Sequence, residues 1–289
     1  MEIVAATKMR RSQEVALRTR PYAASALALL EKLTRGEVPP NPLLAVRPIR
    51  HTALLIVASD RGLTGPFNAQ VFRGTDRFLE GDPYRSDPVH RYSVVAVGRK
   101  VVGYASRRTL PIALRFSGFG DFVRVAEIES LAARLTEGFA RGEWDRVAAV
   151  SMHFRTTLRQ EVLVRQVLPV DFRKIRETVE EIVPEHGRFA EARGGRSGGA
   201  ASATDYLFEP SSAAILESLI PHLVKMQVYH LVLEANASEH SARRVAMKTA
   251  ADNADELSAR LTLAYHRARQ AAITNEMVEI AATQNALAA

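Results

Sequence analysis

The chain has 289 residues, which allows one or two domains. Its formal net charge is +7 and its pI is about 9.9, which suggests an acidic partner. It contains no cysteine, which excludes disulfides, thiolate metal sites and cysteine nucleophiles. No apolar run approaches the roughly 18 residues of a membrane span, and no signal peptide opens the chain.

The charge is unevenly distributed along the chain. Residues 1–35 carry seven Lys or Arg against three Asp or Glu, whereas residues 205–289 carry seven against ten. Residues 36–204 hold the remaining 25 basic and 19 acidic side chains. The two terminal segments are therefore opposite in net charge, and electrostatic attraction favours their association.

Residues 2–35 are predicted to form a helix, because apolar side chains recur in them near helical spacing. Pro21 could bend this helix locally, and Gly36 with the prolines at 39, 40 and 42 ends it. The opening residues, MEIVAATKMRR, have no capping residue before them and resemble the middle of a helix. We therefore expect a truncated chain or a start codon assigned too late.

The middle of the chain, residues 50–183, is predicted to be a Rossmann-like, doubly wound α/β domain. Short apolar runs predict buried strands, and amphipathic stretches between them predict helices. The two kinds of element alternate along the chain, which is typical of this architecture. The predicted strands are 53–58, 92–97, 112–116, 147–153 and 161–168, and the predicted helices are 67–80, 99–108 and 125–140.

Residues 184–205 are rich in Gly, Ser, Ala and Arg, which predicts a flexible loop. Residues 206–289 are predicted to form one long helix, with Pro210 and Ser211 near its start and Pro221 as a possible kink. From His222 to the end there is no Gly or Pro. At 1.5 Å per residue this stretch alone would be roughly 100 Å long, too long for a compact domain to bury.

The predicted fold is therefore an α/β insert domain plus a long antiparallel α-helical coiled coil formed by the N- and C-terminal helices. The apolar seam of the last helix is broken and rich in Ala. Such a seam disfavours a dedicated dimer and suits a rod surrounded by other protein.

Few residues suggest chemistry. The turn Ser59–Gly65 lies between a predicted strand and a helix, where α/β folds bind phosphates. It lacks both the dinucleotide fingerprint and the P-loop, so a tight turn with local contacts is the favoured interpretation. The four histidines of the last helix show no metal-binding spacing. We expect no catalytic site, no metal and no cofactor.

The first helix has a basic face that includes Lys8, Arg10 and Arg11. This face fits an acidic protein surface, and it also fits nucleic acid, although the stretch has no helix-turn-helix partner and no stacking aromatic residue. From these residues alone, three classes stay open: a coiled-coil interaction or scaffold protein, a basic nucleic-acid binder, and a nucleotide-binding enzyme that uses the turn Ser59–Gly65.

Four segments resemble one known family. They are MEIVAATKMRR at 1–11, SDRGLTGPFN at 59–68, VRQVLP at 164–169, and a long run that includes ASEHSAR at 237–243, VAMK at 245–248, DNADEL at 252–257 and RARQAAITNE at 267–276. With these segments the chain resembles the gamma subunit of F-type ATP synthases over nearly its whole length. The chain departs from the family at Pro66, where Gly is usual, and in roughly twenty family residues that precede Met1.

The resemblance implies a central rotor shaft without catalytic residues of its own. The terminal helices would turn inside a ring of three alpha and three beta subunits, and the α/β domain would touch the epsilon subunit and the c ring. Proton flow through the c ring would thereby drive ATP synthesis on the beta subunits, or ATP hydrolysis would drive the reverse. The implied place is the cytoplasmic side of a bacterial cell membrane, peripheral to it and without nucleic acid as a partner.

The resemblance also implies which residues contact the beta subunits. Three on the last helix match family contact positions, and Met1 with the basic face of the first helix would lie opposite acidic beta loops. The segment 273–289 would sit in the sleeve at the top of the ring. The implied contact residues are Met1, Lys8, Arg10, Arg11, Arg269, Gln270 and Thr274, and the family-motif turn comprises Ser59, Asp60, Arg61, Gly62 and Gly65.

Overall fold

The computed structural model describes residues 1–33, 41–119, 123–157, 159–171, 209 and 211–288. The Gly-rich segment at 184–205 lies outside these residues. The chain forms two units, Met1–Arg244 and Val245–Ala289, which are described separately below.

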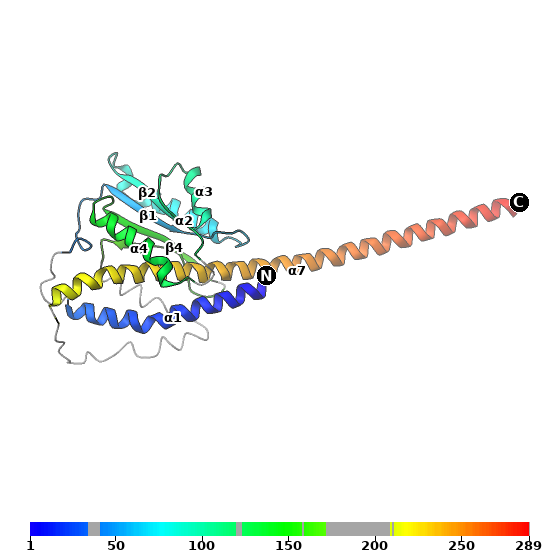
Figure 1. Ribbon diagram of the computed structural model, residues 1–289. Helices are drawn as coiled ribbons and strands as arrows, with labels where there is room; N and C mark the ends of the chain where they lie inside the picture. The colour runs from blue at the N-terminus through cyan, green and yellow to red at the C-terminus, as the bar shows by residue number, and fades with distance from the viewer. Residues whose placement is uncertain (34–40, 120–122, 158, 172–208, 210, 289) are drawn as a thin grey trace. The chain divides into compact units, whose positions relative to one another are not determined.

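A five-stranded sheet forms the centre of the first unit (Figure 1). The order of its strands is β3-β2-β1-β4-β5. Strands β1 to β4 run parallel to one another, with Leu55 of β1 opposite Val95 of β2 and Ala149 of β4. The strands are β1 (His51–Val57), β2 (Arg91–Val97), β3 (Ile112–Phe116), β4 (Arg146–Phe154) and β5 (Gln160–Leu168).

Strand β5 is antiparallel to β4, so the sheet is mixed rather than wholly parallel. A parallel crossover needs a dozen or more residues, whereas a short connection suits an antiparallel hairpin. Only residues 155–159 separate these two strands. The strands lie where the sequence predicts them. The pattern of apolar residues does not say whether β5 runs parallel or antiparallel to β4, and the short connection explains the antiparallel direction.

The helices lie where the sequence predicts them, with small shifts at their ends. The last helix begins at Ser212, and Pro221 lies within it. A short 3-10 helix, η1 (Pro83–Ser86), was not predicted. The α-helices are α1 (Glu2–Leu33), α2 (Phe67–Gly81), α3 (Arg99–Arg107), α4 (Val125–Ala140) and α7 (Ser212–Ala288).

The two faces of the sheet are covered by different helices (Figure 1). Because successive side chains of a strand point to opposite faces, Leu55 joins a core with α1, α4 and the first part of α7. Leu54 and Ile56 join a second core with α2 and α3. This two-sided burial explains why the central strands are continuous apolar runs.

The first part of α7 is buried on every side. All residues from Met226 to Ala235 are buried. A helix that is apolar around its whole circumference belongs in a protein interior, and this stretch packs within the first unit.

The second unit, Val245–Ala289, continues α7 to Ala288. Every residue from Lys248 to Thr283 is exposed. Backbone hydrogen bonds within the helix are therefore the main local source of its order, since no described neighbour covers it. None of the described helices is long and apolar enough to span a bilayer.

Two helical glycines offer a matched test of core packing. A Cβ added at Gly138 of α4 would collide with the ring of Trp144, whereas one at Gly103 of α3 would meet only Arg107 Nη1 at 3.7 Å. We expect Gly138→Ala to lower the free energy of unfolding by about 1–3 kcal/mol through overpacking. Gly103→Ala should raise it by up to about 1 kcal/mol, because Ala favours the helix.

Urea unfolding followed by circular dichroism measures both changes. Equal effects of the two substitutions would contradict the packing of Trp144 on α4.

Candidate functional site

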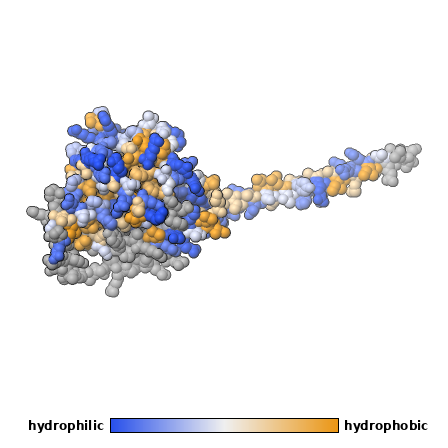
Figure 2. All heavy atoms as spheres, in the orientation of Figure 1, coloured by the Kyte–Doolittle hydropathy of each residue, from blue (hydrophilic) through white to orange (hydrophobic). Residues whose placement is uncertain are grey.

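The exposed part of α7 is the largest candidate interaction surface of the described chain. Its large apolar side chains are between 45% and 67% exposed from Leu257 onward. Figure 2 shows apolar and hydrophilic side chains along this stretch, without segregation of the apolar ones to one end. The exposed apolar residues are Leu257, Leu261, Leu263, Tyr265, Ile273, Met277, Val278 and Ile280. This many exposed large apolar side chains on one helix favour a site of protein interaction.

Arg269, Gln270 and Thr274 all lie on this exposed stretch. The hydroxyl of Thr274 donates to the carbonyl oxygen of Gln270 at 2.9 Å, one turn earlier. The guanidinium of Arg269 and the amide of Gln270 lie on adjacent residues of the helix and are both exposed. These side chains can therefore offer several hydrogen-bond donors to a partner.

The predicted contact residues of α1 belong to the first unit. Three of them, Met1, Arg10 and Arg11, are exposed, and Lys8 is half-buried. On the opposite side of the same helix, Met9 is buried against Phe154 and Ala237. The basic face is therefore outward on a helix whose other face is anchored. The two predicted contact groups fall in different units.

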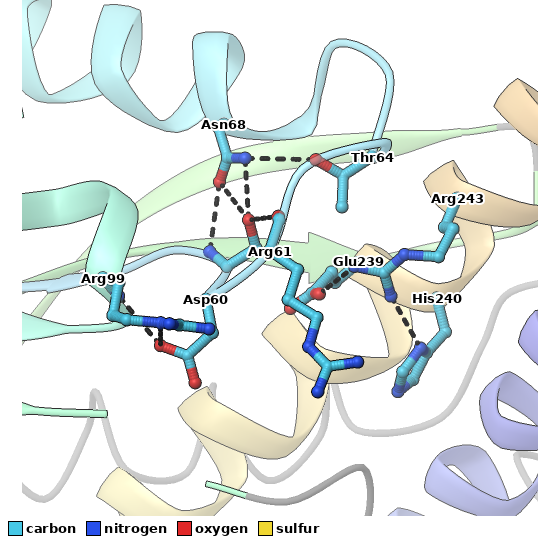
Figure 3. Close-up of polar contacts among 9 residues, drawn as sticks. Asp60, Arg61, Thr64, Asn68, Arg99, Glu239, His240 and Arg243 are labelled. Atoms are coloured by element: carbon cyan, nitrogen blue, oxygen red, sulfur yellow. Dashed lines mark hydrogen bonds and ion pairs between the residues drawn. The ribbon is translucent and has the colours of Figure 1, made fainter. Parts of the chain in front are cut away.

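The predicted turn Ser59–Gly65 follows β1 and is held by Asn68 at the start of α2 (Figure 3). The amide of Asn68 donates to the Ser59 hydroxyl at 2.8 Å and to the Thr64 hydroxyl at 3.1 Å. The side-chain oxygen of Asn68 accepts a hydrogen bond from the Ser59 backbone N–H at 3.1 Å. Polar side chains of the turn are thus satisfied internally.

Asp60 joins the turn to two neighbouring loops. Its carboxylate accepts the backbone N–H of Arg99 at 2.9 Å and that of Gly118 at 2.8 Å. Arg99 is the first residue of α3. A helix N-terminus is where an α/β fold would receive a phosphate, and here the protein's own carboxylate occupies that position at α3. This arrangement favours the structural interpretation of the turn over nucleotide binding.

The backbone of the turn explains the glycine at position 65 and accommodates the proline that follows it. Gly65 has a φ of 52°, in the left-handed region that favours glycine, and Leu63 has a φ of 63°. Pro66 has a φ of −79°, within the range of the pyrrolidine ring, and it immediately precedes α2. Proline at this position therefore fits the turn without distortion of φ.

The exposed Arg61 points from the turn toward the face of α7 that carries Glu239, His240 and Arg243 (Figure 3). Arg243 donates to the Glu239 carboxylate at 2.5 Å, and its other nitrogen lies 3.2 Å from Nδ1 of His240.

A buried charged cluster links α7 to the sheet, and the sequence analysis did not single it out. Oε2 of Glu234 lies 3.0 Å from Nδ1 of His153 on β4 and 3.0 Å from Nη1 of Arg165 on β5. Glu234 is 6% exposed. Its sequence signal is a lone carboxylate inside the apolar run 226–237, which periodicity does not explain.

Two pKa values in this cluster are displaced. Burial raises the pKa of Glu234, but the charge of Arg165 and the hydrogen bond with His153 outweigh burial and leave that pKa well below its usual value. Burial lowers the pKa of the neighbouring His230 to about 4, although Glu234 acts in the opposite sense. The cluster therefore holds an ionised Glu234 and a neutral His230 at neutral pH.

These shifts predict an acid-sensitive first unit. Because the unfolded chain binds a proton at His230 near pH 6.5 while the folded chain does so near 4, the free energy of unfolding falls as the pH drops through this window. We expect a loss on the order of 3 kcal/mol from His230 by pH 4. Glu234 adds a further loss below its unfolded pKa, which is 4.5.

His230→Gln should remove most of the slope between pH 6.5 and 4, and His266→Gln, at an exposed histidine of the second unit, should leave it unchanged. Urea unfolding followed by the fluorescence of Trp144, the single tryptophan, measures the slope. A similar slope in wild type and His230→Gln would show that the burial of His230 does not govern it.

No group of three or more His, Cys, Asp or Glu side chains suited to a metal ion is found among the described residues. The turn at Ser59–Gly65 and the Glu234 cluster are both occupied by internal contacts.

Comparisons with known proteins agree with this picture. A sequence family described as ATP synthase matches residues 1–287. An ATP synthase gamma chain of Roseiflexus castenholzii is 38% identical, covering 100% of this chain and 91% of the relative, and one of Anaeromyxobacter sp. is 37% identical over 99% and 92%.

Solved structures share the fold. A central stalk and c-ring structure of the Tetrahymena thermophila mitochondrial ATP synthase has a TM-score of 0.59 and 21% identity, covering 87% of this chain and 97% of that one. A Euglena gracilis mitochondrial ATP synthase structure with OSCP, F1 and the c-ring has a TM-score of 0.56 and 17% identity, covering 96% and 93%.

Proposed function

The chain belongs to the ATP synthase gamma chain family, and we propose that it is the central-stalk rotor of a proton-translocating F-type ATP synthase. The observation that carries the proposal is the exposed second unit, a helix with apolar side chains around its circumference that no described residue covers. A ring of alpha and beta subunits around this helix would bury them. The nucleic-acid alternative gains nothing from the family assignment.

The proposed mechanism is differential contact rather than catalysis by this chain. A rotor whose faces differ in charge and shape stabilises a different set of beta conformations in each orientation. Proton flow through the c ring turns the rotor, and the beta subunits pass in turn through the states that bind, make and release ATP. The partners are the alpha, beta and epsilon subunits and the c ring, and the chain needs no cofactor for this role.

The proposed beta contacts are Met1, Lys8, Arg10 and Arg11 on α1, and Arg269, Gln270 and Thr274 on α7. The exposure of Arg269 and Gln270 supports this role, since both side chains can donate hydrogen bonds. As part of a membrane-bound complex without a described spanning helix, the subunit is peripheral. We place it on the cytoplasmic side of a bacterial cell membrane.

The helix contacts can be tested in the assembled complex. We expect Arg269→Ala with Gln270→Ala to lower ATP synthesis in membrane vesicles about tenfold, which corresponds to roughly 1.4 kcal/mol of lost interaction. Helicity of the isolated chain should not change, because Ala favours a helix. Coupled synthesis at an imposed proton gradient is the measurement.

The matched control is Ser258→Ala with Arg260→Ala, two exposed residues on the same helix. Normal synthesis in the Arg269/Gln270 variant would remove these residues from the contact. Failure of the wild-type chain to co-purify with alpha and beta subunits as an ATP-hydrolysing complex would overturn the rotor assignment itself.

We also propose that α1 and the first part of α7 pair as an antiparallel coiled coil. Two contacts support the direction. Glu2 lies 3.8 Å from Arg244, and Met9 packs with Ala237. Seven residues forward on α1 therefore correspond to seven residues backward on α7, as an antiparallel heptad requires. The opposite net charges of the terminal segments favour the same pairing.

The cysteine-free chain permits a direct test of this pairing. We expect Met9→Cys with Ala237→Cys to form a disulfide under mild oxidation, because the two residues belong to one buried cluster and a disulfide forms only between residues in close contact. Met9→Cys with Ser218→Cys, which a parallel pairing would favour, is the control. Non-reducing electrophoresis after proteolysis distinguishes them, and cross-linking of the control pair alone would contradict the antiparallel arrangement.

A further inference from the structure

Three polar residues of α7 recur at a spacing of seven: Gln227, Glu234 and Ser241. Residues seven apart lie nearly on one line along a helix, with a drift of about 20° per step. All three are buried, at 5%, 6% and 1% exposure. They form a narrow stripe, here called the polar stripe, within a segment whose other buried residues are mostly apolar.

Each member of the polar stripe bonds the same supersecondary element, the hairpin of β4 and β5. Gln227 Nε2 donates to the carbonyl oxygen of Gln166 at 3.4 Å, at one end. Glu234 contacts His153 and Arg165 at 3.0 Å in the middle. At the other end, the Ser241 hydroxyl donates to the carbonyl oxygen of Thr157, in the connection between the strands, at 2.8 Å.

The surrounding apolar contacts cannot by themselves fix the position of α7 on the β4–β5 hairpin. The hydrophobic effect is non-directional, so an apolar helix in an apolar groove could rotate or slide at modest cost. Hydrogen bonds depend on distance and angle. A slide of one helical turn moves a side chain by about 5.4 Å, which would separate Glu234 from both of its partners and leave a buried carboxylate without compensation.

We propose that the polar stripe fixes the rotational angle and axial register of α7 on the β4–β5 hairpin, so that torque applied to the α/β domain reaches α7 without slip. The inference rests on the proposed rotor function. Gln227, Glu234 and Ser241 are positioning residues: they act through the placement of α7 and not through contact with nucleotide. Arg165 and His153 are their fixed counterparts on the sheet.

The decisive variant removes the directional contact while keeping the interface filled. In Arg165→Met with Glu234→Leu, apolar groups replace the buried ion pair, and such replacements often preserve or raise stability. We expect the assembled complex to keep its ATP hydrolysis rate while the number of protons pumped per ATP falls below the wild-type value, because α7 slips on the hairpin. Val224→Ala, at a fully buried apolar residue of the same helix, is the control.

Val224→Ala should lower thermal stability and leave the pumping ratio unchanged, since it leaves the polar stripe intact. If the ion pair had a purely structural role, the pumping ratio would follow stability. Val224→Ala would then lower the pumping ratio more than Arg165→Met with Glu234→Leu does. Single-molecule rotation with a bead on a cysteine introduced at the exposed Arg107 gives a second readout, wider angular fluctuation in the slipping variant. If that double variant does not assemble, Ser241→Ala provides the same test at a single hydrogen bond.

Wild-type pumping and wild-type angular fluctuation in the slipping variants would overturn the proposal. The rotor function is judged separately by the wild-type chain. If wild type assembles and couples but the polar-stripe variants couple equally well, only the positioning role fails. If wild type neither assembles nor rotates with the alpha and beta subunits, the proposed function fails first.

Discussion

The ladder of backbone hydrogen bonds along α7 after Pro221, which neither Gly nor Pro interrupts, is the constraint on which this structure depends. The helix runs from Ser212 to Ala288, and after Pro221 it contains neither Gly nor Pro. Gly would add backbone freedom and Pro would remove a donor and kink the helix. Along the exposed stretch no tertiary contact among the described residues supports the helix, so composition alone must keep it stiff.

The first unit serves to hold one end of this helix. The sheet has a core on each face, and the core that contains α1 and α4 also takes in the first part of α7. The turn after β1 stabilises the carboxyl edge of the same sheet, because Asp60 ties the start of α3 and the loop at Gly118 together. Asp60 lies in a turn where the sequence allows a ligand-binding role, and in the structure it joins two neighbouring loops of the fold.

Among the described residues of α7, Glu234 is the buried carboxylate that pairs with charged or polar groups of the sheet. Glu234 is expensive to bury, and Arg165 and His153 compensate it only in one arrangement. The apolar contacts around it supply most of the favourable burial, and the ionic contact supplies direction. Apolar contacts thus stabilise the packing of this helix segment, and the polar stripe specifies its orientation. This difference in role explains why polar residues occur in a segment that is otherwise mostly apolar.

The sequence by itself determined the elements: strand and helix positions follow from periodicity, and the long last helix follows from the absence of Gly and Pro after Pro221. Through family resemblance it also led to the prediction that Arg269 and Gln270 contact a partner, and the structure leaves both residues exposed. Only the tertiary structure decided that β5 pairs antiparallel with β4, that Asp60 occupies the start of α3, and that Glu234 meets Arg165. Local patterns report propensity and burial, whereas these contacts join residues up to 69 positions apart and depend on how the whole chain closes.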